Sequence, residues 1–152
     1  WAGQTHTVYG GFSLPDCDGP PSYSGAMDTQ ASRFLLVSTV FIDGAAADDS
    51  EIAQLTLHTA SGTRYEVPLR LGIETQRMNA ASCDGCVAVI EWHKRAQLRG
   101  FSGYPGVYDD FTARMWATVI ELDIPDEPFT RFDIAITMPD LQLTIWDFSP
   151  LP

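Results

Sequence analysis

The sequence has 152 residues, of which 45% are hydrophobic, and it includes eight Phe, five Tyr and four Trp. This apolar content excludes a disordered chain and is sufficient for one folded domain. Asp and Glu number 20 against nine Lys and Arg, which gives a formal net charge of −11. Nucleic acid and anionic membrane surfaces are therefore disfavoured as partners, because both are bound by clustered cations.

The first third of the chain predicts two strands separated by an irregular segment. Alternation of apolar and polar residues predicts a strand over residues 7–12. Residues 13–30 are rich in Gly, Pro and Tyr and lack periodicity, so we expect a surface loop there. Residues 33–42 are apolar at both odd and even positions, which is typical of a central strand covered on both faces.

A β-hairpin is the clearest local prediction. Residues 53–59 and 64–71 alternate with period two on either side of an Ala-Ser-Gly turn at residues 60–62. Pro68 lies on the polar face of the second segment and has no backbone N–H to donate. We therefore expect this strand to lie at a sheet edge or to contain a bulge.

Four further strands are predicted in the second half, over residues 87–92, 113–124, 131–138 and 141–148. The short link Pro139-Asp140 predicts that the last two form a second hairpin. Residues 95–110 lack periodicity and are expected to form a surface loop.

About eight strands without a helix predict a single domain over residues 1–152, in which residues 1–30 are an irregular N-terminal segment. Half-buried sheets must pair their apolar faces to exclude water. We therefore expect an all-β fold, namely a two-layer antiparallel β-sandwich (jelly roll).

Three cysteines are present, and Cys83 and Cys86 belong to a Cys-Asp-Gly-Cys motif. A redox site would need this motif at the start of a helix, and haem attachment would need His where Val87 stands. A structural disulfide is favoured, either between Cys83 and Cys86 or between one of them and Cys17. Inert thiols and a metal or redox site are the alternatives.

Acidic residues suggest one metal hypothesis. Asp16-Cys17-Asp18-Gly19 resembles the start of a calcium loop, but its twelfth position is Met27 where an EF-hand has Glu. A structural calcium ion is the one cofactor considered. Its candidate ligands are Asp16 and Asp18, or Asp48 and Asp49.

A saccharide site would need an exposed aromatic ring beside polar side chains. The candidates on and beside the second loop are Trp92, Arg95, Tyr104, Tyr108 and Asp109. The alternative is that Trp92 lies in the core and the tyrosines brace the loop.

No catalytic residues are predicted. The nucleophile motif Gly-x-Ser-x-Gly is absent, and His6, His58 and His93 lie far apart in the sequence. The neighbouring carboxylates Asp109 and Asp110 would point to opposite faces of a strand and would not flank one glycosidic bond.

Several segments resemble galactose-binding-domain-like jelly-roll modules of bacterial envelope proteins. They are RYEVPLRLGIET at residues 64–75, EWHKRA at 91–96 and TRFDIAITMPDLQLTIWDFS at 130–149. The resemblance implies a non-catalytic appendage that binds sugars, lipid head groups or proteins through loops at one end of the sandwich, sometimes with a structural calcium ion.

We therefore expect a non-catalytic binding or scaffolding module, acting as a subunit or accessory domain of an envelope assembly. The alternative is a carbohydrate-binding module. The sequence begins at Trp1, as expected for a mature product or a fragment, which favours a periplasmic, cell-surface or secreted location. No stretch reaches the roughly 18 apolar residues of a membrane span.

Overall fold

The computed structural model describes residues 12–14, 22–42, 46–95, 110–123, 125 and 127–152. For residues 12–14, 92–95 and 110–113 this description covers the backbone alone. The strands are β1 (Phe12–Leu14), β2 (Ser22–Thr29), β3 (Arg33–Ile42), β4 (Glu51–Thr59), β5 (Arg64–Arg70), β6 (Val87–Arg95), β7 (Asp110–Glu121), β8 (Phe129–Ile136) and β9 (Leu141–Pro150).

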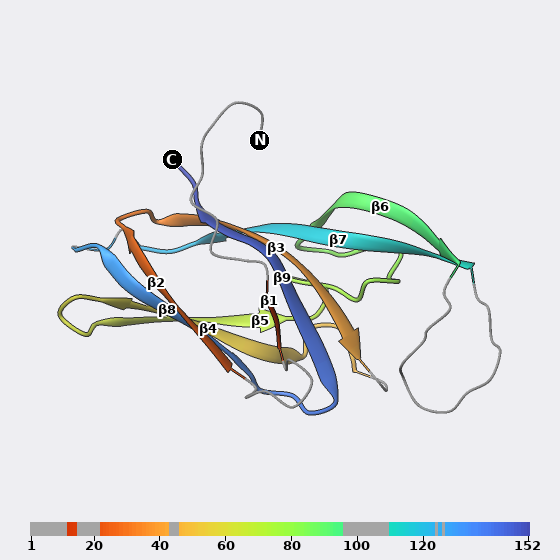
Figure 1. Cartoon of the computed structure of the whole chain (residues 1–152), viewed down its shortest axis with the longest axis horizontal. Coiled ribbons are helices and arrows are strands. Elements are labelled where there is room, and N and C mark those ends of the chain that lie inside the picture. The colour runs from red at the N-terminus through yellow and green to blue at the C-terminus, as the bar shows by residue number, and fades with distance from the viewer. Residues whose placement is uncertain (1–11, 15–21, 43–45, 96–109, 124, 126) are drawn as a thin grey trace.

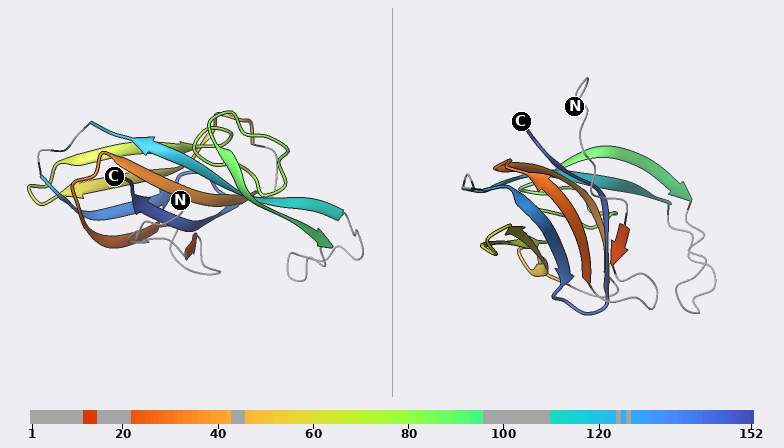
Figure 2. Two further views of the ribbon diagram at one scale, coloured as in Figure 1. Left: turned by 90° about the horizontal axis from the view of Figure 1, so that it is seen from above. Right: turned by 60° about the vertical axis from the view of Figure 1, so that its left-hand side comes forward.

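Within these residues the strands form two antiparallel sheets that pack face to face (Figure 1). One sheet has five strands in the order β1-β9-β3-β7-β6, and the other has four in the order β2-β8-β4-β5. The two further views show the same layers, with β6 and β7 extending together past the other strands (Figure 2). This confirms the prediction of an all-β, two-layer antiparallel sandwich.

Strand β3 is central, as the sequence predicts. It pairs with β7 on one side and with β9 on the other. Phe34 and Leu36 face the core between the sheets, whereas Leu35 and Val37 belong to a smaller buried cluster on the opposite face. Burial on both faces explains why β3 is apolar at both parities.

The hairpin of β4 and β5 is also confirmed, and β5 lies at the edge of the four-stranded sheet. Pro68 is tolerated there because an edge strand does not need every N–H for pairing. Gly62 in the connecting turn has a φ of 92°, which glycine adopts without strain.

The prediction of an irregular segment over residues 13–30, and over 1–30 more broadly, is wrong for residues 22–29. These residues form β2, which pairs with β8 at the other edge of the four-stranded sheet. As an edge strand of small and polar residues, β2 buries the side chain of Met27 but leaves most others exposed. The apolar alternation of a strand is therefore nearly absent from its sequence.

The second predicted hairpin is wrong as well. The segment after β8 does lead directly into β9 through Pro139 and Asp140, but β8 and β9 lie in different sheets. Their apolar side chains meet across the core instead of sharing one face, as Phe132 and Phe148 show with ring centroids 5.2 Å apart. Alternation alone does not distinguish these two arrangements.

The core between the sheets contains a group of aromatic rings. Phe148 stacks on Phe34 at 5.2 Å, and Phe34 lies 6.0 Å from Phe129 of the facing sheet. Tyr65 meets Phe129 edge to face at 5.2 Å. The contact between Phe34 and Phe129 joins the two sheets, and the other two pack rings within each sheet, by the burial of large apolar side chains.

Candidate functional site

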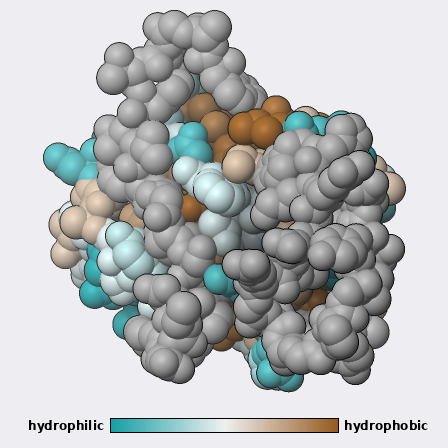
Figure 3. Space-filling model, turned by 45° about the vertical axis from the view of Figure 1, so that its right-hand side comes forward, coloured by the Kyte–Doolittle hydropathy of each residue, from teal (hydrophilic) through white to brown (hydrophobic). Residues whose placement is uncertain are grey.

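Among the described residues of β6 and β7, three exposed apolar side chains lie on the outer face of the five-stranded sheet, the face turned away from the other sheet. Val87 and Ile90 of β6 are 63% and 50% exposed, and Val119 of β7 is 38% exposed. We call these three residues the outer patch. Apolar, brown atoms reach the surface at the top of the molecule in Figure 3. Isolated surface apolar residues are ordinary, but a group on one face indicates a contact surface.

A second buried cluster lies beside the outer patch, on the same face of the sheet. Leu35, Val37 and Ala117 form it, and Met115 and Leu151 pack against it. Val87 lies opposite Ala117 in the ladder between β6 and β7, and Ile90 lies opposite Met115. The outer patch is therefore the exposed part of a larger apolar surface on this face.

The segment between β5 and β6 determines where β6 begins. Gly72 has a φ of 83°, and its carbonyl oxygen accepts hydrogen bonds from the backbone N–H groups of Asp84 and Gly85 at 2.9 and 3.2 Å. A Cβ atom on Gly85 would lie 2.7 Å from the carbonyl oxygen of Ile73. Glycine at position 85 permits this close approach of two backbone segments.

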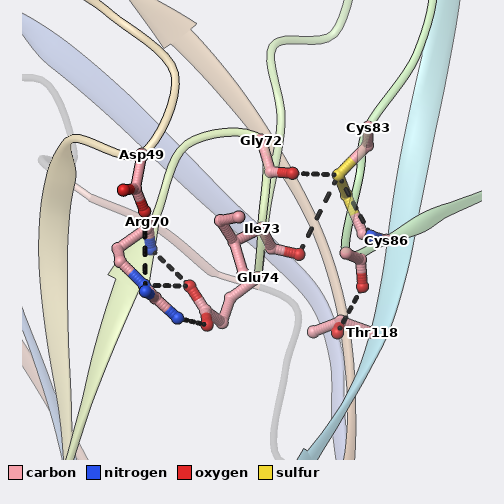
Figure 4. Close-up of polar contacts among 9 residues, drawn as sticks. Asp49, Arg70, Gly72, Ile73, Glu74, Cys83, Cys86 and Thr118 are labelled. Atoms are coloured by element: carbon pink, nitrogen blue, oxygen red, sulfur yellow. Dashed lines mark hydrogen bonds and ion pairs between the residues drawn. A yellow bond between two sulfur atoms is a disulfide. The ribbon is translucent and has the colours of Figure 1, made fainter.

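A disulfide between Cys83 and Cys86 closes the same turn (Figure 4). The backbone N–H of Cys86 donates to the Sγ atom of Cys83 at 3.1 Å, and Gly85 accepts a hydrogen bond from the Thr118 hydroxyl of β7 at 3.1 Å. The disulfide thus fixes the residue directly before Val87 against the five-stranded sheet. Of the alternatives left open by the sequence, the structure shows pairing of Cys83 with Cys86.

An ion pair supports the start of this segment. The guanidinium of Arg70 donates to both carboxylate oxygens of Glu74, at 2.6 and 3.2 Å, and lies 3.5 Å from Asp49 (Figure 4). The hydrogen bond with Glu74 raises the pKa of Arg70 above its ordinary value. Such a two-point contact fixes the orientation of both side chains.

The structure describes only two of the four candidate calcium ligands, Asp48 and Asp49. Asp49 faces Arg70, whereas Asp48 accepts a hydrogen bond from Gln76 at 3.5 Å. Asp16 and Asp18 lie outside the described residues. Across the part of the chain that the structure describes, no three His, Cys, Asp or Glu side chains gather as a metal site would require.

The predicted saccharide residues are placed only in part. Trp92 and Arg95 lie on β6, opposite Ala113 and Asp110 of β7. Tyr104, Tyr108 and Asp109 lie outside the described residues. The saccharide hypothesis for this group therefore stays a prediction.

A polar cluster lies on the outer face of the four-stranded sheet. His58 donates to Asp133 at 2.6 Å, and Arg131 donates to the same carboxylate at 3.0 Å. Burial raises the pKa of Asp133, but the neighbouring Ser24, the hydrogen bond from His58 and the charge of Arg131 outweigh it, so the pKa lies below its ordinary value. The Asp133 carboxylate lies between Ser24 and the His58 imidazole. An activated serine needs the imidazole next to its hydroxyl, so this arrangement does not activate Ser24.

This cluster predicts a specific acid sensitivity. The folded pKa of Asp133 lies below its ordinary value of 3.8. The charged carboxylate therefore contributes its full share of the free energy of unfolding above pH 3.8, and this contribution is lost as the pH falls through the folded pKa. Urea unfolding of wild type and Asp133→Asn at about pH 5 and about pH 3 tests this. We expect wild type to lose more stability than Asp133→Asn over this interval, with Asp28→Asn behaving like wild type. Equal losses in wild type and Asp133→Asn would contradict the role of this carboxylate.

Comparisons with known proteins find no relative. No protein-family model, no curated protein and no solved structure matches the chain. The resemblance to galactose-binding-domain-like modules therefore stays a prediction. No helix in the described part of the chain is long and apolar enough to cross a membrane.

Sequence reasoning did not identify the outer patch. Val87, Val89 and Ile90 were expected to belong to a strand, but nothing in the run Val-Ala-Val-Ile shows which side chains face solvent. The position of β6 at a sheet edge decides this.

Proposed function

We propose that this chain is a non-catalytic binding or scaffolding module that acts outside the cytoplasm and docks a protein partner through the outer patch. The observation that supports the proposal most directly is the group of Val87, Ile90 and Val119, exposed on the face that also carries the second buried cluster. Burying such a face against a partner removes apolar surface from water, which is the main driving force of protein association.

Two further observations support the proposed location outside the cytoplasm and the proposed non-catalytic role. The Cys83–Cys86 disulfide is of the kind that persists in oxidising compartments outside the cytoplasm. Among the described residues, Arg70, Glu127 and Asp133 have shifted pKa values, and contacts with neighbouring side chains account for each shift. A subunit or accessory domain of an envelope assembly combines these features.

The first test is the native mass of the protein, purified under mild conditions from its own source. Size exclusion coupled to light scattering should give a stable mass well above the 16.7 kDa of the chain. The double variant Val87→Asp with Ile90→Asp should shift the protein toward monomer mass, because charged groups would be buried without partners.

A matched control adds the same charge to the other sheet. Ser22→Asp with Ala26→Asp changes two exposed residues of β2 and should leave the native mass unchanged. A monomeric wild type would overturn the proposal. So would an assembly that survives Val87→Asp with Ile90→Asp at full mass.

A further inference from the structure

A small groove lies on the outer face of the five-stranded sheet, where β3 and β9 pair. It has a volume of about 200 Å³ and is lined by residues 39–41 of β3, by Gln142, Thr144 and Trp146 of β9, and by Met78. Every one of these side chains is neutral. The groove is separate from the outer patch, which lies on β6 and β7.

Trp146 lies at a bulge in β9. Val37 pairs with Asp147 and Ser38 pairs with Ile145, so Trp146 is the extra residue between two steps of the ladder. Bulges commonly redirect a side chain at a functional position. Leu143 and Ile145 face the core, so alternation turns the indole of Trp146 outward, and the extra residue lets Phe148 face the core again.

The indole ring is both held and accessible. Its Nε1–H donates to the Thr39 hydroxyl at 3.1 Å, and 44% of the residue is exposed. A ring fixed before binding loses little conformational entropy when a ligand stacks on it. An exposed, preoriented tryptophan is costly to leave uncovered, since it presents a large apolar surface to water.

We infer that this groove binds one ring of a neutral saccharide. The C–H face of a pyranose would cover the indole of Trp146, and its hydroxyls would exchange hydrogen bonds with the Gln142 amide and the Thr39 hydroxyl. An anionic sugar is disfavoured because none of the described residues that line the groove is a cation and the chain carries a net charge of −11.

The dimensions of the groove limit the ligand and its affinity. Pockets for drug-sized ligands usually enclose roughly 300–1,000 Å³, and this groove is smaller, so it accommodates one ring at a time. A single ring with few polar contacts should bind with a Kd of about 1 mM. Longer neutral glycans gain affinity only from contacts outside the groove.

The test uses methyl β-galactoside, methyl β-glucoside and N-acetylglucosamine, each titrated into the whole chain and followed by saturation-transfer NMR. At least one should bind wild type at about 1 mM, and Trp146→Ala should weaken its binding at least about tenfold. Trp146→Phe should retain part of the affinity because it keeps an aromatic face. Tyr23→Leu removes a half-exposed ring from the other sheet and should bind like wild type.

Unfolding midpoints of each variant establish that loss of binding is not loss of fold. If Trp146→Ala is unfolded, Gln142→Ala takes its place and should weaken binding through the lost amide contacts. Failure of all three saccharides to bind wild type would overturn the inference, as would unchanged binding by folded Trp146→Ala. Neither result depends on the outer patch, so this inference and the proposed docking function fail separately.

Discussion

Replacing Phe148 by Ala should destabilise the protein by about 3–5 kcal/mol, because the substitution leaves a cavity at the centre of the core. Phe148 is fully buried, and its ring centroid lies 5.2 Å from Phe34 in its own sheet and 5.2 Å from Phe132 in the facing sheet. Loss of one ring therefore removes contacts within and between the sheets. Urea unfolding followed by tryptophan fluorescence measures the change in the free energy of unfolding.

A surface substitution in the same sheet tests whether the loss of stability comes from the buried position of Phe148 or from truncating any apolar side chain of the sheet. Val119→Ala removes apolar atoms from a residue that is 38% exposed, and it should change the free energy of unfolding by less than about 0.5 kcal/mol. A cost of less than about 1 kcal/mol for Phe148→Ala would contradict the position of this ring between the two sheets.

The parts of the fold that depend on local physics could be predicted from the sequence. Apolar residues at both parities identified β3 as a central strand, and the structure confirms it. The proline at position 68 predicted either an edge strand or a bulge because it lacks a backbone donor, and β5 is an edge strand. Each of these inferences needs only the residues of one strand.

The parts that depend on long-range pairing could not be predicted. The alternation of β8 and β9 is the same whether the strands share a sheet or face each other across the core. Strand β2 shows little apolar alternation because it lies at an edge, and its identity comes from pairing with β8. The bulge at Trp146 arises from the register between β3 and β9, which neither strand reveals alone.

The candidate surfaces were missed for the same reason. Sequence reasoning searched the irregular segment over residues 95–110, because loops usually carry binding residues. The outer patch and the groove at Trp146 lie instead on strands, on the outward face of a sheet. Which face of a strand is outward depends on the second sheet, and the pattern of one strand does not contain that information.

Replacing Gly25 by Ala should destabilise the protein by about 1–3 kcal/mol, because the position has no room for a methyl group. A Cβ atom at Gly25 would lie 2.3 Å from the Cε1 atom of Phe132, directly opposite in the β2–β8 ladder. Phe132 is fully buried beside Phe148, so its ring cannot turn away without disturbing the core. Equilibrium unfolding in urea measures the cost, and Ser22→Ala, an exposed change on the same strand, should be nearly neutral.

A double-mutant cycle tests whether this cost comes from contact with Phe132 or from the backbone of β2. Phe132→Leu shortens the opposing side chain and should destabilise the protein by itself. In that background Gly25→Ala should cost less than in wild type, with a coupling of about 0.5–3 kcal/mol. Equal costs in both backgrounds would place the effect in the conformation of the strand. A positive coupling would show that the ring of Phe132 requires glycine at position 25. Strand β2 has almost no apolar alternation of its own, so its register would then depend on packing against β8.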